Sequence, residues 1–490
     1  MPSFADMARG RWGLAALLLA GCTADSTSEP TAVERNVVLV VVDSLRADHT
    51  GVYGYGPPTT PYLDRLAENS VVFDTAWAPS SYTSQSVAAI LTGRLPTSGG
   101  SVGLMEAEPS EASTPLQQRL RRAGLRTGVV SSQPLLRRRA FTRGFEDIQV
   151  SSLKETWTAG EVSSKALDFV DGDPEAPFFL YLHYADPHQP YNAPPEFVDR
   201  FRPEGSPEVT VPELQRSIEE GGLEPDDPRA AALVAAYDAE IAAVDAGIEA
   251  LVAGLDERGL FDDTILVVTA SQGEELLDHG WWGHAWTLHE EVLRVPLLLR
   301  MKELGARRVR EAVSLVDLLP TLIALVGLAT DDIESEGDAF ARIGERGPEL
   351  RPAGRPKIAE LIIKERCIHR AVLDPPLKYI ATSLDCPLGE RRAIAADYPN
   401  RLRGIADGTV AEPELWAEPT REAVFNLATD PRERTNLAED GEEALATFRR
   451  VLDNYAAYTR EHGLVGAKAA IPADLIDPEQ AERLESLGYL

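Results

Sequence analysis

The sequence predicts an α/β fold: a large, open, mostly parallel sheet with helices on both faces, followed by a small C-terminal α+β subdomain. Apolar runs of strand length alternate with helical patterns along the first two thirds of the chain. Such runs are typical of strands that are buried on both faces of a parallel sheet. After about residue 354, the pattern changes to short strands followed by one long helix.

The strands predicted for the large sheet are the apolar runs 36–42, 178–182, 264–268 and 295–299. Helical patterns between them cover residues 61–69, 114–123 and about 227–258. In open α/β sheets, ligands bind beyond the carboxyl ends of the strands. Asp43 directly follows the first run, so we expect it at the functional edge of the sheet.

The rest of the folded chain divides into linkers and a smaller unit. Segments 185–228 and 329–356 are rich in Pro, Gly and Glu, and are interpreted as excursions or linkers. We assign residues 36–354 to the main domain and residues 355–490 to the smaller subdomain. In the latter, short strands at 358–363, 369–372 and 378–382 precede a helix at 442–459.

The composition excludes one class of partner. The chain has 490 residues and a formal net charge of -30. Phosphate backbones would be repelled by such a surface, so we expect no nucleic-acid binding.

The N-terminus predicts export. Arginines at 9 and 11 precede the apolar run 14–19, which is too short to span a bilayer and is typical of a signal peptide. The tetrapeptide Leu-Ala-Gly-Cys22 resembles a bacterial lipobox, in which the cysteine carries a lipid. We therefore predict a signal peptide at 1–21, a flexible tether at 22–35 and a lipid anchor in the bacterial envelope, facing the periplasm or exterior. The alternative is a simple secretory signal with an incidental cysteine.

Two further cysteines, Cys367 and Cys386, remain in the exported chain. They could pair in an oxidising compartment, or both could be buried thiols.

Three clusters of residues lie at 36–64, 280–298 and 425–437, and contain the segments DSLRADH, TLHEEVLRVP and FNLATDPRERTNL, respectively. Together they resemble the sulfatase family of the alkaline-phosphatase superfamily. The resemblance covers about residues 36–490 and points to bacterial sulfatase-like lipoproteins of the branch with a threonine nucleophile. It implies the family fold and hydrolysis of sulfate or phosphate esters. It also implies a divalent cation (Ca²⁺, Mg²⁺, Mn²⁺ or Zn²⁺) held by oxygen ligands.

The same resemblance places Thr83 at the nucleophile position and Ser86 on the family's serine, which we expect to bind substrate. Threonine cannot be oxidised to formylglycine, so no formylglycine is expected. Thr83 could attack as a metal-activated alkoxide, or it could simply cap the following helix.

The resemblance implies that much of the metal site is missing. Asp43 matches the first carboxylate ligand, whereas Ser271, Gln272 and Trp286 replace ligands of the family. Serine and glutamine can coordinate only as neutral dipoles, and affinity for hard cations rises with the number of carboxylates. The expected cation would therefore be weakly bound or absent.

One more constellation matches the family: Asp186 and His188 in the segment Asp-Pro-His-Gln-Pro-Tyr. In relatives these groups contact the substrate anion or a second metal, and we predict catalytic roles for both; the alternative is a structural turn. His284 is predicted to bind substrate. Two functions follow: a pseudoenzyme that binds an anionic ester or a partner, or an active ester hydrolase with Thr83 as nucleophile.

Overall fold

The computed structural model describes residues 33–103, 107–152, 155–219, 227–364, 367–383, 416, 419–439 and 441–464. The predicted signal peptide, most of the tether, Cys22 and Cys386 lie outside the described residues. Cys367 is disulfide-bonded, and its partner also lies outside these residues. No helix within these ranges has the length and apolarity that a membrane crossing requires.

A large, mostly parallel sheet forms the centre of the described chain. Its eight strands stand in the order β12-β2-β11-β7-β1-β6-β4-β5. The middle strand β1 pairs in parallel with both β6 and β7, whereas β11 runs antiparallel to β7 and β2. The bounds are β1 Asn36–Val42, β2 Val71–Phe73, β4 Arg126–Ser131, β5 Asp147–Val150, β6 Phe178–Tyr184, β7 Thr264–Ala270, β11 Leu297–Arg300 and β12 Arg307–Val309. The predicted fold class is confirmed.

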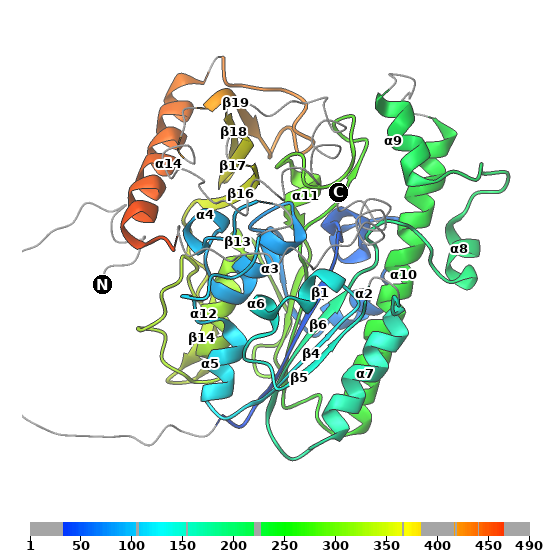
Figure 1. The fold of residues 1–490 in the computed structure, drawn as a ribbon, viewed down its shortest axis with the longest axis vertical. Helices are drawn as coiled ribbons and strands as arrows, with labels where there is room; N and C mark the ends of the chain where they lie inside the picture. The colour runs from blue at the N-terminus through cyan, green and yellow to red at the C-terminus, as the bar shows by residue number, and fades with distance from the viewer. Residues whose placement is uncertain are drawn as a thin grey trace, which may run out of the picture.

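Helices cover both faces of this sheet (Figure 1). The long helix α10 (Pro228–Glu257) packs beside α7 (Ala159–Asp171) on one face. On the other face lie α3 (Thr83–Thr92), α5 (Leu116–Arg122) and α12 (Leu318–Leu325). All residues of β1, β6 and β7 are buried, as expected for parallel strands between two helical layers. The shorter helices are α2 Pro61–Ala67, α4 Pro96–Gly99, α6 Arg139–Thr142, α8 Pro195–Phe201, α9 Val211–Glu219 and α11 Glu290–Leu293.

Two segments differ from the prediction. The apolar run at 295–299 is divided at Pro296 into β10 (Arg294–Val295) and β11. Proline lacks the N–H that a strand interior needs, and β10 joins β3 (Ala76–Trp77) and β13 (Val313–Ser314) in a separate small sheet. The segments interpreted as linkers contain α8, α9 and the hairpin of β14 (Ala341–Gly344) and β15 (Gly347–Leu350).

The C-terminal part is a four-stranded antiparallel sheet with one long helix. The sheet comprises β16 (Lys357–Lys364), β17 (Cys367–Asp374), β18 (Leu377–Ser383) and β19 (Pro419–Asn426). Helix α14 (Glu442–His462) runs alongside it in Figure 1. This confirms the small C-terminal α+β part, while the exact boundary near residue 354 stays a prediction.

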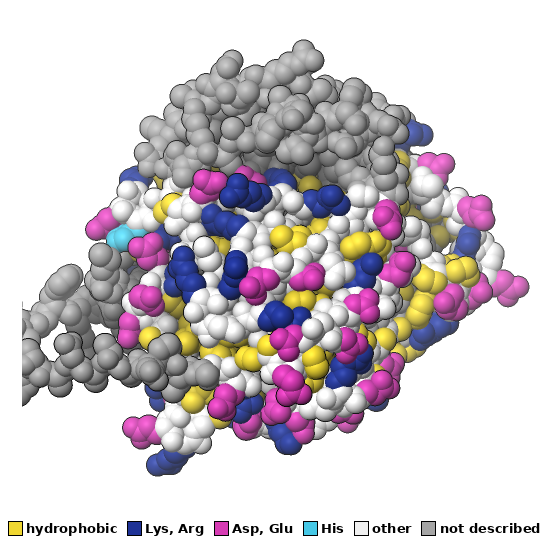
Figure 2. Space-filling model, turned by 60° about the horizontal axis from the view of Figure 1, so that its bottom comes forward, with side chains coloured by type: hydrophobic (Ala, Val, Ile, Leu, Met, Phe, Trp, Pro, Cys, Tyr) yellow, Lys and Arg dark blue, Asp and Glu magenta, His cyan; other side chains and the backbone are white. Residues whose placement is uncertain are grey.

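The surface carries both signs of charge. On the face shown in Figure 2, acidic and basic side chains are interspersed between patches of polar and apolar atoms. Such mixing is typical of a solvated surface.

Candidate active site

Asp43 lies where the ends of three central strands meet. Its backbone N–H donates to the carbonyl oxygen of Tyr184 at the end of β6 (2.8 Å), and the N–H of Ser271, after β7, donates to Val42 (3.0 Å). The side chain of Asp43 is fully buried. The structure therefore places Asp43 at the carboxyl edge of the sheet, as its position after β1 predicted.

One oxygen of the Asp43 carboxylate is surrounded by three donors. Its Oδ1 atom accepts hydrogen bonds from the hydroxyls of Thr83 (3.1 Å) and Ser271 (2.7 Å). The amide Nε2 of Gln272 donates to the same oxygen at 2.7 Å. Three of the residues predicted at the family's nucleophile and ligand positions, Thr83, Ser271 and Gln272, thus donate to Asp43, whereas no such contact is seen for Trp286 among the described hydrogen bonds.

The other oxygen is held by two residues that the sequence did not single out. Gln133 Nε2 donates to Asp43 Oδ2 at 2.6 Å, and His183 Nε2 lies 3.5 Å from it. Burial alone would raise the pKa of Asp43, but the hydrogen bond and charge of His183, with the charges of His188 and His284, hold that pKa well below its usual range. His183 lies at the end of β6, which pairs with β1, and Gln133 follows β4, the next strand of the sheet; these positions at strand ends were the available signal for both residues.

Thr83 is the first residue of α3 and does not cap it. The N-cap position belongs to Tyr82, which makes no side-chain cap, and the Thr83 hydroxyl donates to Asp43 instead. This placement speaks against the capping alternative. The hydroxyl of Ser86, one turn further, donates to the carbonyl oxygen of Ser271 and so joins α3 to the end of β7.

His284 lies on another side of the site, next to Glu274 and Ser44. Its Nδ1 atom lies 2.9 Å from Glu274 Oε1 and 3.4 Å from the hydroxyl of Ser44. Burial lowers the pKa of His284, but the charges of Glu274 and Asp43 outweigh burial and raise it. Ser44 has a left-handed backbone (φ 57°), a strained conformation of the kind found at functional sites. Trp286, two residues beyond His284, is partly buried.

The loop after β6 contains Asp186 and His188, the remaining predicted site residues. The rings of His188 and His284 meet edge to face at 4.9 Å. Burial, together with the negative charge of Asp43, raises the pKa of Asp186 to about 7. Glu240, a buried residue of α10, accepts a hydrogen bond from the backbone N–H of Asn192 and fixes this loop. Glu240 could not be singled out from the sequence, because it lies inside a long helical pattern.

The comparison with protein families decides the assignment. The family model described as Sulfatase matches residues 35–328, more than half of the chain. The chain belongs to the sulfatase family. The fold is accordingly one that is suited to hydrolysis of sulfate or phosphonate esters.

Individual sulfatases and related structures resemble the chain over most of its length. It is 27% identical to human N-sulphoglucosamine sulphohydrolase over 446 residues, which cover 83% of this chain and 86% of the relative. It is 23% identical to an arylsulfatase of Clostridium perfringens, over 61% of this chain and 76% of the relative. The phosphonate monoester hydrolase of Agrobacterium radiobacter has the same fold, with a TM-score of 0.64, 19% identity and coverage of 86% and 96%.

Sulfatases are generally dependent on a divalent metal. Among the residues described here, no group of three or more His, Cys, Asp or Glu side chains is arranged to hold a metal ion. The carboxylate of Asp43 accepts hydrogen bonds from the hydroxyl of Ser271 and the amide of Gln272.

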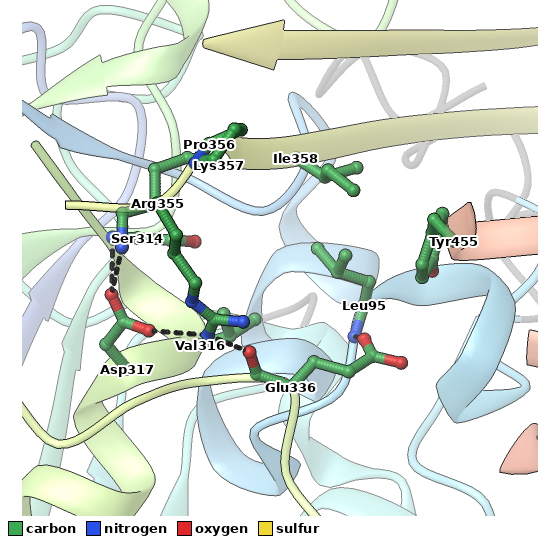
Figure 3. A pocket seen from close by; sticks show the side chains of 10 residues that line it. All are labelled: Leu95, Ser314, Val316, Asp317, Glu336, Arg355, Pro356, Lys357, Ile358 and Tyr455. Carbon is green, nitrogen blue, oxygen red and sulfur yellow. Dashed lines mark hydrogen bonds and ion pairs between the residues drawn. The ribbon is translucent and has the colours of Figure 1, made fainter. Parts of the chain in front are cut away.

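A separate cavity lies between the large sheet region and the C-terminal sheet (Figure 3). Its volume is about 30 Å³, enough for one or two water molecules. In Figure 3, Arg355 reaches between Asp317 and the backbone of Glu336. The cavity is lined by Leu95, Ser314, Val316, Asp317, Glu336, Arg355, Pro356, Lys357, Ile358 and Tyr455, and none of the predicted site residues is among them.

Proposed function

We propose that this sulfatase-family chain binds an anionic sulfate or phosphate ester at the Asp43 edge and hydrolyses it slowly or not at all. The proposal rests on the hydrogen bonds of the Asp43 carboxylate. Within the described residues, it accepts hydrogen bonds from the side chains of Thr83, Gln133, Ser271 and Gln272. A dication needs converging oxygen lone pairs with several negative charges. The residues at these positions do not fit such an ion, because they direct hydrogens rather than lone pairs at the Asp43 carboxylate.

Histidine side chains gather at the Asp43 edge, where an anionic ester would need positive charge. The charge of Glu274 outweighs burial and raises the pKa of His284, whereas burial lowers the pKa of His188. Three of the chain's eight histidines, His183, His188 and His284, lie close enough to Asp43 to lower its pKa. The names of the relatives point to the same ligand chemistry, since arylsulfatases and phosphonate monoester hydrolases act on tetrahedral anionic esters. We therefore assign ester contact to His188 and His284, with Asp186 as a neighbouring acid.

The second candidate is an active hydrolase with Thr83 as nucleophile. One observation favours it: the Thr83 hydroxyl donates to a buried carboxylate within hydrogen-bond reach, as nucleophiles do toward a base. The low pKa of Asp43 weighs against it, because a carboxylate that resists protonation is a poor acceptor for the hydroxyl proton.

We also propose that a lipid on Cys22 holds the protein in the bacterial envelope. The support is the basic, then apolar, N-terminus that ends in Leu-Ala-Gly-Cys22. Full-length protein should partition with membranes, and Cys22→Ser should release it to the soluble fraction. Equal partitioning of both forms would contradict the anchor.

The function is tested on the purified wild-type chain with three measurements. Metal analysis after dialysis should find clearly less than one divalent ion per chain. Hydrolysis of an aryl sulfate and an aryl phosphate should be no faster for the wild type than for Thr83→Ala. Calorimetry with the aryl sulfate should detect binding that His284→Ala weakens, whereas His462→Ala, at the end of α14, should bind normally.

Three results would contradict the proposal. One tightly held ion per chain would restore the family's metal chemistry. Turnover that Thr83→Ala abolishes would establish the second candidate. A folded wild-type protein that binds neither aryl ester would contradict the proposed ligand class.

A further inference from the structure

His284 lies in a segment that leaves the large sheet, forms a small hairpin and returns as helix α11. The hairpin consists of β8 (Glu275–Leu276) and β9 (Trp282–Gly283), and His284 directly follows β9. The backbone N–H of Ala285 donates to the carbonyl oxygen of Ser81 at 3.0 Å. The residues before α3 therefore hold the middle of this segment, where His284 lies.

Glu433, in the C-terminal part of the chain, contacts the segment on both sides of His284. Its carboxylate accepts a hydrogen bond from the backbone N–H of Glu290 (2.7 Å) and lies 3.1 Å from His289 Nδ1. Its backbone carbonyl oxygen lies 3.3 Å from His279 Nε2, in the turn of the hairpin. One residue thus joins the turn that precedes His284 to the start of the helix that follows it.

The two histidines that meet Glu433 also contact each other. The rings of His279 and His289 are nearly parallel (10°), and their centroids lie 3.7 Å apart. His279 Nδ1 contacts a carboxylate oxygen of Glu291. Burial alone would lower the pKa of His279, but the contacts with Glu291 and Glu433 outweigh burial and raise it. The two sides of the segment are therefore joined to each other as well as to Glu433.

Glu433 is fixed by a buried cation of the C-terminal sheet. The ammonium group of Lys378, in β18, lies 2.9 Å from Glu433 Oε1, and both side chains are fully buried. Burial alone would raise the pKa of Glu433, but the charge of Lys378 outweighs burial and lowers it. A buried charge that loses its partners is strongly destabilised, so these contacts keep the carboxylate at the segment.

Left-handed backbone conformations mark the site and this contact. Within the described residues, the non-glycine residues with positive φ are Ser44 (57°), Leu277 (72°), Ala285 (68°) and Glu433 (53°). Leu277 and Ala285 belong to the segment, and the hydroxyl of Ser44 lies 3.4 Å from His284 Nδ1. Such conformations are unfavourable and persist only where the surrounding contacts hold them. The segment therefore depends on contacts from outside it, and Glu433 supplies several of them.

We propose that Glu433 is a positioning residue of the ester site, through which the C-terminal sheet holds His284 beside Glu274. This inference rests on the proposed function, in which His284 contacts the ester. Glu433 acts through the segment, since its carboxylate is buried against Lys378 and the start of α11. Loss of its charge would loosen both sides of the segment, and His284 would no longer be held 2.9 Å from Glu274.

The test compares the wild type with Glu433→Gln and a matched control, Asp317→Asn, in the full chain. Glu433→Gln keeps the shape of the side chain but removes the charge that faces Lys378. Asp317 is also a buried carboxylate that accepts backbone N–H groups and contacts a lysine of the C-terminal sheet, Lys357, at 3.3 Å. It lies in the cavity of Figure 3, which none of the predicted site residues lines. Both exchanges should therefore lower stability, and only that of Glu433 should reach the ester site.

Calorimetry with the aryl sulfate measures the affinity of proteins that circular dichroism shows to be folded. Glu433→Gln should bind at least about five-fold more weakly than the wild type, whereas Asp317→Asn should stay within about two-fold of it. Added to His284→Ala, the Glu433→Gln exchange should cause no further loss, because its effect passes through His284. An equal loss in Asp317→Asn would overturn the inference, as would losses that simply add in the double variant.

A second measurement does not depend on ester binding. NMR can follow the ring signals of the eight histidines, and the signal of His284 is identified by its absence in His284→Ala. Glu433→Gln should move this signal, and Asp317→Asn should leave it in place. A wild type that binds no ester would contradict the proposed function, but the signal would still decide the positioning. An unmoved His284 signal in Glu433→Gln would overturn the inference.

A folding failure also leads to a decision. If Glu433→Gln aggregates, His279→Gln takes its place, because the side chain of His279 is 16% exposed and its exchange removes only one side of the contact. That variant should bind the ester at least about two-fold more weakly and should move the His284 signal. Unchanged binding or an unmoved signal would overturn the inference.

Discussion

Glu336 is a carboxyl group whose titration should be visible in the stability of the whole protein. Its side chain lies in the cavity of Figure 3, in a residue that is only 7% exposed, and its Oε2 atom accepts a hydrogen bond from the backbone N–H of Leu95 at 2.7 Å. Burial raises the pKa of Glu336 to about 7, and the charge of Glu360 adds to the rise. The perturbation is Glu336→Gln, which keeps the shape and the acceptor but removes the charge.

The magnitude follows from the pKa. A rise from 4.5 to about 7 spans about 2.5 pKa units, each equivalent to roughly 1.4 kcal/mol. The folded state binds the proton more tightly, so this stabilisation is fully present below about pH 4.5 and is lost as the pH rises through about 7. At about pH 8, Glu336→Gln should therefore unfold with a free energy about 3 kcal/mol higher than that of the wild type, whereas at about pH 4.5 the two should be nearly equal.

Urea unfolding at several pH values between these limits measures the difference. Glu345→Gln, in the exposed turn between β14 and β15, is the matched control and should change the unfolding free energy by less than about 0.5 kcal/mol throughout. A difference in unfolding free energy between wild type and variant that does not change with pH would contradict the raised pKa of Glu336. So would a variant that is less stable than the wild type at about pH 8.

Two further substitutions test the packing around the site and the contact with the C-terminal sheet. A Cβ atom on Gly273 would overlap the carbonyl oxygen of Glu291, so Gly273→Ala should lower the unfolding free energy by about 2–4 kcal/mol, measured by urea unfolding; unchanged stability would contradict this geometry. Lys378 is buried between Glu290 (3.1 Å) and Glu433 (2.9 Å). Lys378→Met should cost about 3–5 kcal/mol because both carboxylates would lose their cation, and a Tm equal to that of the wild type would contradict the contact.

The sequence predicts the centre of the fold better than its edges. Strands β1, β6 and β7 are buried on both faces, so their residues are almost all apolar and the pattern is unambiguous. Strands such as β4, which contains Arg126, Thr127 and Ser131, and β12, which begins with two arginines, lie toward the sides of the sheet. Polar residues interrupt their pattern, and only the pairing with a neighbour identifies them as strands.

The candidate site could be predicted where a residue directly follows a strand or matches a family motif. Asp43 satisfied both conditions, and the motifs located Thr83, Ser271 and Gln272. Glu240 satisfied neither condition, since it is one residue of the 30-residue helix α10. Its hydrogen bond with the backbone of Asn192 depends on which face of that helix meets the loop after β6. Contacts of this kind depend on tertiary structure and leave no local pattern.

The structure also changes the argument about charge. The sequence suggested that a cation would be held weakly because too few carboxylates remain. Yet Glu274 lies in the wall of the site beside His284, and Asp186 lies close enough for the charge of Asp43 to raise its pKa. Carboxyl groups are therefore present at this edge, although burial raises the pKa of Asp186, and the carboxylate of Asp43 accepts hydrogen bonds from amide and hydroxyl groups. A count of carboxylates in the sequence therefore does not describe this site, because the tertiary structure decides which groups face the Asp43 carboxylate.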